Sequence, residues 1–233
     1  MDNYNSMKLV RKGHGHAHRG VIGVESAIVM IAFVIVAAAL AFVVLNMGFS
    51  TTQRAKTAII ASLEEASSSL EIAGKVTGSG DVTASLMNVT AVPLKIASGG
   101  DSVNMNLQLT AVKYLSNSIE YDNIYNGTLQ TGSYVNLTQA MQAAVGSSYL
   151  RSNPINDTAN PGQTTAILYW AVNRNNNFIL DQGEHAILAI VHGADERPGP
   201  LDMIRSEIIV PTGAPLTIER LVPNVTHDVV DLG

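Results

Sequence analysis

The chain has 233 residues, of which 46% are hydrophobic, and it contains no cysteine. The lack of cysteine excludes a disulfide scaffold, a thiol nucleophile and thiolate metal sites. The formal net charge of −5 and the isoelectric point near 5.6 argue against a nucleic-acid partner. The length is sufficient for one globular domain with its own core, in addition to an unusually apolar N-terminal segment.

The first 20 residues form a basic leader. It contains four basic residues and one acidic residue, Asp2, so its removal would leave a chain with a net charge of −8. Basic residues beside an apolar segment tend to stay on the cytoplasmic side of a membrane. The long acidic part of the chain is therefore expected to cross the membrane.

A continuous apolar stretch follows the leader. No charged or polar side chain occurs in residues 27–45, which as a helix would span about 28 Å, close to the thickness of a bilayer core. The residues after this stretch lack the small-residue cleavage site of an ordinary secretory signal, so the helix is expected to remain in the mature protein. Glu25 lies at the start of the stretch, where an unpaired carboxylate is costly and indicates a functional role. Cleavage between Gly20 and Val21 would create an α-amino group to pair with Glu25, in the same chain or in a neighbour.

This arrangement resembles the class III signal peptides of type IV pilins and archaeal flagellins (archaellins). The shared features are a basic leader that ends in Gly20, a cut before Val21, and an acid at the fifth mature position, Glu25. Residues 23–59, with AFVVLNMGF followed by TTQ, are similar to the N-terminal helix of archaellins in particular. The resemblance implies a structural subunit of the archaeal flagellum (archaellum). The sequence contains no GxSxG, HExxH or phosphate-loop motif, so no enzymatic activity is expected.

The resemblance also implies partners and a location. Copies of the chain, alone or with paralogous archaellins, would polymerise through the N-terminal helix into an extracellular motility filament. A prepilin-peptidase-like signal peptidase would remove residues 1–20 from a membrane-inserted precursor, and the archaellum export and motor machinery would act on the mature subunit. Two alternatives remain open, namely an archaeal adhesive type IV pilin and a membrane-anchored surface protein that never polymerises.

The helical pattern continues beyond the apolar stretch. Small and apolar residues recur at three- and four-residue spacing on one face, at Ala55, Ile59, Leu63, Ala66, Leu70 and Ala73. Gly74 is a helix stop signal, so one helix is predicted over residues 21–74. Because the first half is apolar all round, lipid must surround it before assembly and neighbouring copies afterwards. A head-to-tail contact that does not close would produce a helical filament. In the alternative interpretation, the second half is a stalk that lies against its own head domain.

From Asp81 onward the pattern is that of strands. Val103, Met105, Leu107 and Leu109 alternate with polar residues, which predicts a half-buried strand. Gly-, Pro- and Asn-rich breaks separate further predicted strands at 82–96, 134–138, 164–173, 186–192, 204–210 and 216–221, with a short helical turn at 139–145. Residues 75–233 are therefore predicted to form an antiparallel β-sandwich, giving an α+β chain. The archaellin resemblance implies that this sandwich is immunoglobulin-like.

Five N-glycosylation sequons occur in the C-terminal part and none in the first 80 residues. Their asparagines are Asn88, Asn126, Asn136, Asn156 and Asn224. Their crowding fits an outward-facing surface that carries N-linked glycans, which the archaellin resemblance also implies. Asn88 and Asn136 fall in predicted strands and would be poor acceptors if their side chains pointed inward.

Residues 173–184, NRNNNFILDQGE, allow two interpretations. Their oxygen-bearing groups match the spacing of a calcium loop, with side chains of Asn173, Asn175, Asn177, Asp181 and Glu184 and the backbone carbonyl of Ile179. Against calcium, Phe178 replaces the glycine of the sharp turn, and two carboxylates would give weak binding. The other interpretation is a polar hairpin turn that requires no cofactor.

Overall fold

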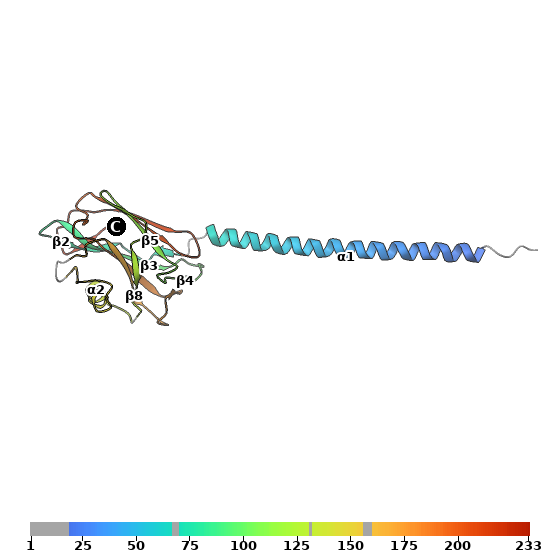
Figure 1. The fold of residues 1–233 in the computed structure, drawn as a ribbon, viewed down its shortest axis with the longest axis horizontal. Helices are drawn as coiled ribbons and strands as arrows, with labels where there is room; N and C mark the ends of the chain where they lie inside the picture. Colours follow the sequence, from blue (N-terminus) through green and yellow to red (C-terminus); the bar gives the residue numbers. More distant parts are fainter. Residues whose placement is uncertain (1–18, 67–69, 131, 156–159) are drawn as a thin grey trace, which may run out of the picture. The chain divides into compact units, whose positions relative to one another are not determined.

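The computed structural model describes residues 19–66, 70–130, 132–155 and 160–233. The chain divides into a helical unit that ends at Ile59 and a globular unit from Ile60 to Gly233. Helix α1 (Arg19–Ala66) is one continuous helix of 48 residues, which corresponds to about 72 Å (Figure 1). The hydroxyls of Thr51 and Thr52 donate to the carbonyls four residues earlier, each at 2.8 Å. These polar side chains are thus satisfied within the helix itself.

The helix ends earlier than the spacing of apolar residues predicts. Leu70, which was expected on the apolar helical face, lies in strand β1 (Leu70–Ile72) and is only 1% exposed. This strand pairs antiparallel with β3 (Leu86–Ile96), with Leu70 opposite Ile96. The predicted boundary at residue 74 is therefore wrong. Leu70 and Ala73 fit a helical stripe locally, but sheet pairing and burial in the core override local preference.

The globular unit contains two main β-sheets. The first has the order β13 (Val229–Asp231), β2 (Thr77–Asp81), β3, β10 (His185–Val191), β8 (Thr165–Val172) and β7 (Tyr125–Thr128), with β1 also paired to β3. The second has the order β12 (Leu216–Leu221), β11 (Met203–Ile209), β5 (Ala111–Ser116) and β6 (Glu120–Tyr121). A small ladder joins β4 (Val103–Asn104) to β9 (Ile179–Leu180). The described strand pairs are antiparallel apart from β7 and β8, which run parallel.

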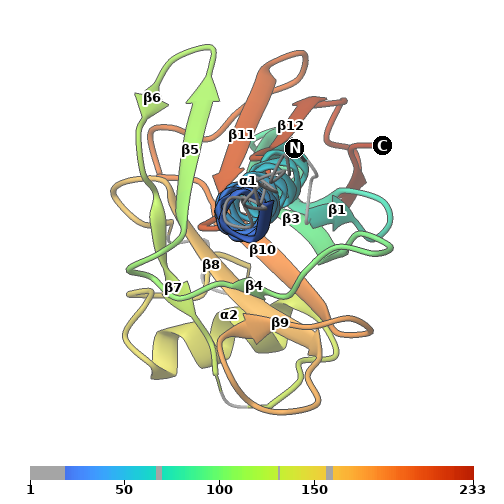
Figure 2. The same cartoon turned by 90° about the vertical axis from the view of Figure 1, so that its right-hand side faces the viewer.

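The main core lies between the facing sides of the two sheets, and Figure 2 shows the β5, β6, β11 and β12 layer on one side of it. Trp170 of β8 and Leu188 of β10 are fully buried on the seven-stranded side. Tyr114 of β5 and Ile208 of β11 belong to the same core cluster. This arrangement confirms the predicted sandwich.

Helix α2 (Leu137–Gly146) covers part of the other face of the seven-stranded sheet. Its Ala140, Met141 and Ala144 are buried in a second apolar cluster with residues of β3, β8 and β10. Asn136 caps the helix, because its Oδ1 accepts a hydrogen bond from the backbone N–H of Gln139 at 2.8 Å. The strand predicted at 134–138 is therefore wrong, whereas the helical turn predicted at 139–145 is confirmed.

The predicted strands at 164–173, 186–192, 204–210 and 216–221 are confirmed as β8, β10, β11 and β12. The strand predicted at 82–96 begins only at Leu86, because Asp81 Oδ1 accepts from the backbone N–H groups of Thr83 and Ala84 and turns the chain. The strand predicted from Val103 to Leu109 is wrong beyond residue 104. The side chains of Asn104 and Asn106 each accept a hydrogen bond from the N–H two residues later, which favours turns over a ladder.

Candidate functional site

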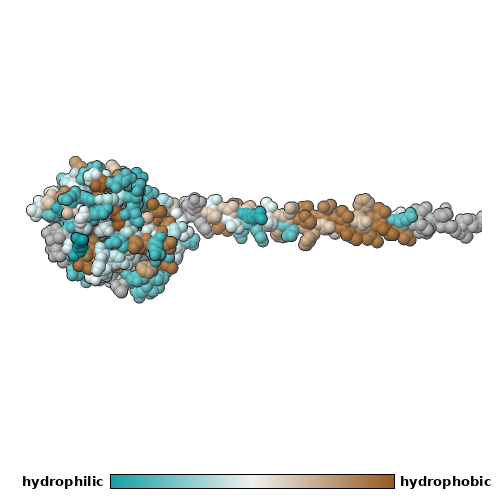
Figure 3. Space-filling model, in the orientation of Figure 1, coloured by the Kyte–Doolittle hydropathy of each residue, from teal (hydrophilic) through white to brown (hydrophobic). Residues whose placement is uncertain are grey.

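The candidate site is the surface of helix α1. All its described side chains, from Gly23 to Leu63, are exposed, including Phe33 at 72% and Phe49 at 70%. On the face shown in Figure 3, apolar residues cover the helix continuously over a long stretch. The mean hydropathy reaches 3.3, so by length and composition the helix could cross a membrane. Because burial of each large apolar side chain contributes about 1.5–3 kcal/mol, this surface requires lipid or protein around it.

Two glycines lie within this surface at Gly23 and Gly48. A Cβ atom at either position would meet nothing within 4 Å in this chain. Glycine inside a helix costs about 0.5–1 kcal/mol relative to alanine. Contacts within the described chain therefore give no structural reason for glycine at these positions.

Glu25 is exposed near the start of the described helical surface. The backbone is helical from Arg19, so Val21 and Glu25 are four residues apart along one helix and share a face. The same spacing places the proposed cleavage bond, between Gly20 and Val21, one turn before the carboxylate. Residues 1–18 of the basic leader lie outside the described residues.

The sequon asparagines differ sharply in their surroundings. Asn88 is 4% exposed, its Nδ2 donates to the carbonyl of Pro154, and its Oδ1 accepts from Arg197. Asn126 is half-buried, and its Nδ2 donates to the carbonyl of Tyr149 at 2.9 Å. Asn136 and Asn224 are exposed. Asn88 is therefore unsuited to carry a glycan in the folded domain.

Asn136 also keeps its amide nitrogen outside the helix-capping hydrogen bond, which uses only Oδ1. The expectation of an inward-pointing strand position thus fails for Asn136 and holds for Asn88. The fifth sequon asparagine, Asn156, lies outside the described residues.

The loop at residues 173–184 is closed by its own oxygen atoms. Glu184 is 1% exposed, and its two carboxylate oxygens accept from the backbone N–H groups of Arg174 and Asp181 at 2.7 and 3.2 Å. The Oδ1 atoms of Asn173, Asn175 and Asn177 accept from backbone N–H groups within the loop. Asp181 accepts from the side-chain amide of Asn175.

These hydrogen bonds close the loop through its own side chains, as the polar-turn interpretation expects. Each carboxylate oxygen of Glu184, which would be the bidentate ligand of a calcium loop, accepts one backbone hydrogen bond. Ile179 belongs to β9 and pairs with Asn104. Among the described residues, no group of three or more His, Asp or Glu side chains is placed to share a metal ion.

His192 is one of several buried polar residues in the described part of the chain that have no distinctive sequence signal. His192 is fully buried, with its Nε2 2.9 Å from Thr90 Oγ1 and its Nδ1 3.3 Å from Tyr114 Oη. Burial lowers its pKa to about 3, although the nearby Glu196 carboxylate acts in the opposite direction. A neutral imidazole supplies one donor and one acceptor, which suits two hydroxyl partners. His192 is therefore a structural residue.

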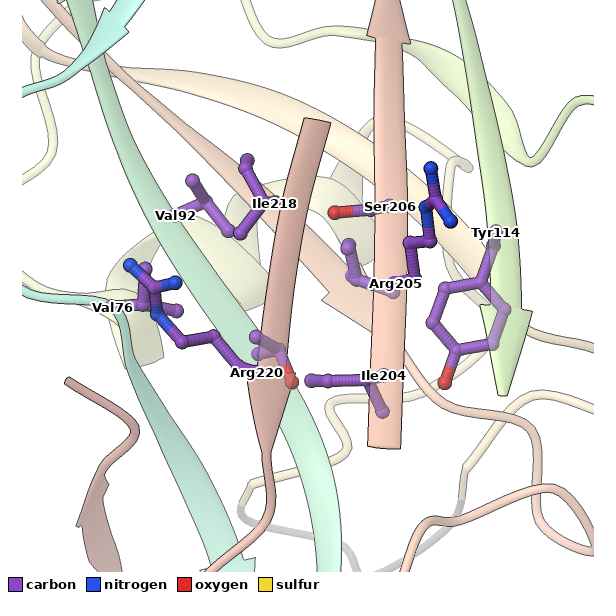
Figure 4. Close-up of a pocket in the computed structure, with 10 residues that line it drawn as sticks. Val76, Val92, Tyr114, Ile204, Arg205, Ser206, Ile218 and Arg220 are labelled. Carbon is purple, nitrogen blue, oxygen red and sulfur yellow. The ribbon is translucent and has the colours of Figure 1, made fainter. Parts of the chain in front are cut away.

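A small cavity lies between the sheets, lined by residues that include Val92, Tyr114 and Ile204 (Figure 4). Its volume of about 10 Å³ is room for at most one water molecule. This cavity is too small for a substrate or cofactor, so it supports no catalytic role.

Comparisons with known proteins agree with the architecture. The family model for archaeal-type flagellin matches residues 20–220. The chain is 37% identical over 209 residues to "Probable flagellin 1" of Aeropyrum pernix, covering 88% of this chain and 92% of the relative.

Two solved structures share the fold. The crystal structure of archaeal flagellin FlaB1 from Methanocaldococcus jannaschii has a TM-score of 0.54 at 14% identity, covering 70% of this chain and 95% of that one. The archaeal flagellum of Methanospirillum hungatei strain JF1 has a TM-score of 0.51 at 20% identity, covering 89% and 98%. Both the exposed apolar helix and the sandwich thus have counterparts in known flagellins. The chain belongs to the archaeal-type flagellin family and is a structural subunit of the extracellular archaeal flagellum filament.

Proposed function

We propose that α1 is the element through which the subunits polymerise. The observation that carries this proposal is the exposed apolar surface from Gly23 to Leu63, of which no part is buried within the chain. In the precursor, lipid covers this surface, and in the filament the α1 helices of neighbouring copies cover it. Because α1 moves from one apolar environment to another, close packing and polar pairing decide whether the filament is more stable than the membrane-inserted state.

The glycines support close packing of these helices. Because a Cβ at Gly23 or Gly48 would meet nothing in this chain, the cost of glycine there is explained by the close approach of another copy. Ala37, Ala38 and Ala39 provide a further run of small side chains on the exposed helix.

Groups in the first turn of the mature helix control release from the membrane. A prepilin-peptidase-like signal peptidase cuts after Gly20, and the new α-amino group of Val21 pairs with Glu25 of the same or a neighbouring chain. A carboxylate among apolar helices is costly unless it is paired, so this pair favours correctly aligned subunits. The uncut leader withholds the amino group and keeps the precursor in the membrane.

The sandwich forms the outer part of the filament and faces the solvent. The exposed asparagines Asn136 and Asn224 are the best placed of the described sequons to carry N-linked glycans. The filament consists of this chain, alone or with paralogous flagellins, and transmits rotation from the archaellum motor. The family is a structural one, and we assign no enzymatic activity to the chain.

The proposal is tested by replacing Glu25 in the full chain, in cells that have no other flagellin. Glu25→Gln keeps the size and polarity of the side chain but removes its charge. We expect it to enter the membrane normally and to give far fewer filaments than Glu25→Asp, which keeps the charge. N-terminal sequencing of sheared wild-type filaments should begin at Val21. Normal filament yield from Glu25→Gln, or filaments that retain residues 1–20, would contradict the proposal.

A further inference from the structure

The sandwich exposes its most accessible large apolar side chains on two opposite sides. Val135, Val229 and Leu201 are 90%, 74% and 74% exposed, the highest values among large apolar residues of the globular unit that the structure describes. Val135 and Val229 border a hollow on the outer face of the seven-stranded sheet. Leu201 precedes β11 in the four-stranded layer.

Leu201 is held in a conformation that leucine rarely adopts. Its φ is +67°, at the third position of a tight turn in which Asp202 N–H donates to the carbonyl of Gly199 at 3.1 Å. A positive φ at this position of a turn usually calls for glycine, because a Cβ atom makes it strained. The chain thus maintains strain for a side chain that contacts little of its own domain.

The turn also has a fixed geometry. The backbone N–H of Gly199 donates to Asp202 Oδ2 at 2.8 Å, and the N–H of Leu201 donates to the carbonyl of Val222 at 2.8 Å. Asn117 donates to the other carboxylate oxygen of Asp202 at 2.8 Å. Leu201 is therefore presented at a defined position beside the end of β12. Strained residues in rigid surroundings are often functional.

Two further exposed residues extend this apolar surface. Met203 and Leu221 are directly opposite each other on β11 and β12, and they are 45% and 52% exposed. We call Leu201, Met203 and Leu221 the Leu201 patch. Arg205 follows Met203 on the same face of β11 and forms no ion pair with any described residue.

The opposite side of the sandwich has a matching hollow, which we call the α2 groove. Helix α2 covers only part of the seven-stranded sheet, as Figure 2 shows, and the groove beside it has a volume of about 500 Å³. Its lining includes Ala91, Pro93, Tyr169 and Ile187 of the sheet, bordered by Val135 and Val229. Such a volume is large enough to receive several aliphatic side chains. Asp228 lies at the rim and, among the described residues, has no cationic partner.

We propose that the Leu201 patch of one subunit docks in the α2 groove of a neighbouring subunit in the filament. The partner is a second copy of this chain, since the family consists of filament subunits whose copies adjoin. The two surfaces are different and lie on opposite layers of one sandwich. Contact between them is head-to-tail, the kind of contact that forms an open helical filament when its rotation does not close a ring. Arg205 beside the patch lies opposite Glu219 of β12, and both Lys75 and Asp228 line the groove, so each surface carries a charge that can pair with the other.

This inference rests on the proposed polymerisation and adds a contact between head domains to the packing of α1. Absence of cysteine from the natural chain allows a clean test by cross-linking. The double variant Leu201→Cys/Val229→Cys is produced as the only flagellin of a cell, and sheared filaments are treated with a short bismaleimide. A bond within one chain keeps the product at the size of a monomer on a denaturing gel, so it cannot be mistaken for the ladder.

We expect a ladder of covalent dimers, trimers and longer products from the double variant, and monomers from each single variant. Thr217→Cys/Val229→Cys is the matched control, since Thr217 is exposed on β12 four residues from Leu221, and it should stay monomeric. Filaments of the double variant that give no ladder would overturn the inference. Dimers from Leu201→Cys alone would also overturn it, because they would show a symmetric contact. Failure of the wild-type chain to form any filament would overturn the proposed function as well.

A second variant separates the effect of backbone strain at Leu201 from the effect of its side-chain contact with the neighbouring subunit. Leu201→Gly suits the positive φ, so the head domain should be at least as stable to heat as the wild type. The filaments of this variant should nevertheless dissociate at a lower temperature, because the patch has lost its central side chain. Leu107→Ala, which shortens an exposed leucine elsewhere, should leave filament dissociation unchanged. Filaments of Leu201→Gly that are as heat-stable as the wild type would contradict the docking.

Discussion

Protonation of His192 should destabilise the sandwich in acid. The imidazole is fully buried between Thr90 and Tyr114, and burial lowers its pKa to about 3 from an ordinary value near 6.5. The folded domain therefore holds the ring neutral, whereas the unfolded chain binds a proton below pH 6.5. Stability from this difference is fully present above pH 6.5 and is lost as the pH falls toward 3.

The expected loss of stability depends on how far the pH lies below the pKa of the histidine in the unfolded chain. Each pH unit below 6.5 removes about 1.4 kcal/mol of stability until the folded pKa is reached. At pH 4.5 the loss from His192 is thus about 2.7 kcal/mol, a large part of the 5–15 kcal/mol that typically stabilises a domain.

The assay uses the full chain in detergent, unfolded with denaturant at several pH values. Trp170 is the only tryptophan and is fully buried, so its fluorescence reports unfolding of the sandwich. His192→Gln removes the titrating group, and its unfolding free energy should fall less steeply between pH 6.5 and 4.5 than that of the wild type. His227→Gln, at an exposed position, is the control and should keep the wild-type slope. Equal slopes for the wild type and His192→Gln would refute the reasoning.

Three further predictions concern the sandwich. Gly78→Ala should lower the unfolding free energy by about 1–3 kcal/mol, because its Cβ would lie 2.5 Å from the backbone carbonyl oxygen of Val89 and collide with Met87; denaturant titration measures the loss. EDTA should leave the melting temperature unchanged, whereas Glu184→Gln should lower it, because the new NH2 group replaces one of the two buried acceptor oxygens and faces a backbone N–H; a calcium-dependent melting temperature would refute this account of the loop. Asn136→Gln should remove a glycan mass from filament protein, and Asn88→Gln should not; mass spectrometry that shows a glycan on Asn88 would contradict the structure.

The elements that the sequence predicts well are those with strong local signals. The long apolar run of α1 is compatible with a helix and with no other regular structure. The hydrophobic segments of β8 and β10 are typical of strands buried on both faces. Asn136 lies in a segment where apolar and polar residues alternate, and this pattern hides the N-cap of α2. Leu107 and Leu109 alternate like strand residues, but the asparagine side chains before them stabilise turns.

The functional surfaces also differ in how well the sequence predicts them. The assembly surface of α1 is contained in one continuous segment, so composition alone identifies it. The spacing of Leu70 fits the helical stripe, whereas its actual place in β1 depends on pairing with Ile96, which is distant in sequence. The Leu201 patch and the α2 groove also escape sequence analysis. The groove brings together strands from distant parts of the chain, the patch depends on the register between β11 and β12, and the positive φ of Leu201 appears only in the structure.

Electron cryomicroscopy of native sheared filaments tests the central claim most directly. The account predicts that each subunit begins at Val21 and that its α1 helix is packed against the α1 helices of neighbouring copies around the filament axis, with the sandwiches outside. A filament in which α1 makes no contact with other copies, or in which the sandwiches alone form the axis, would contradict it.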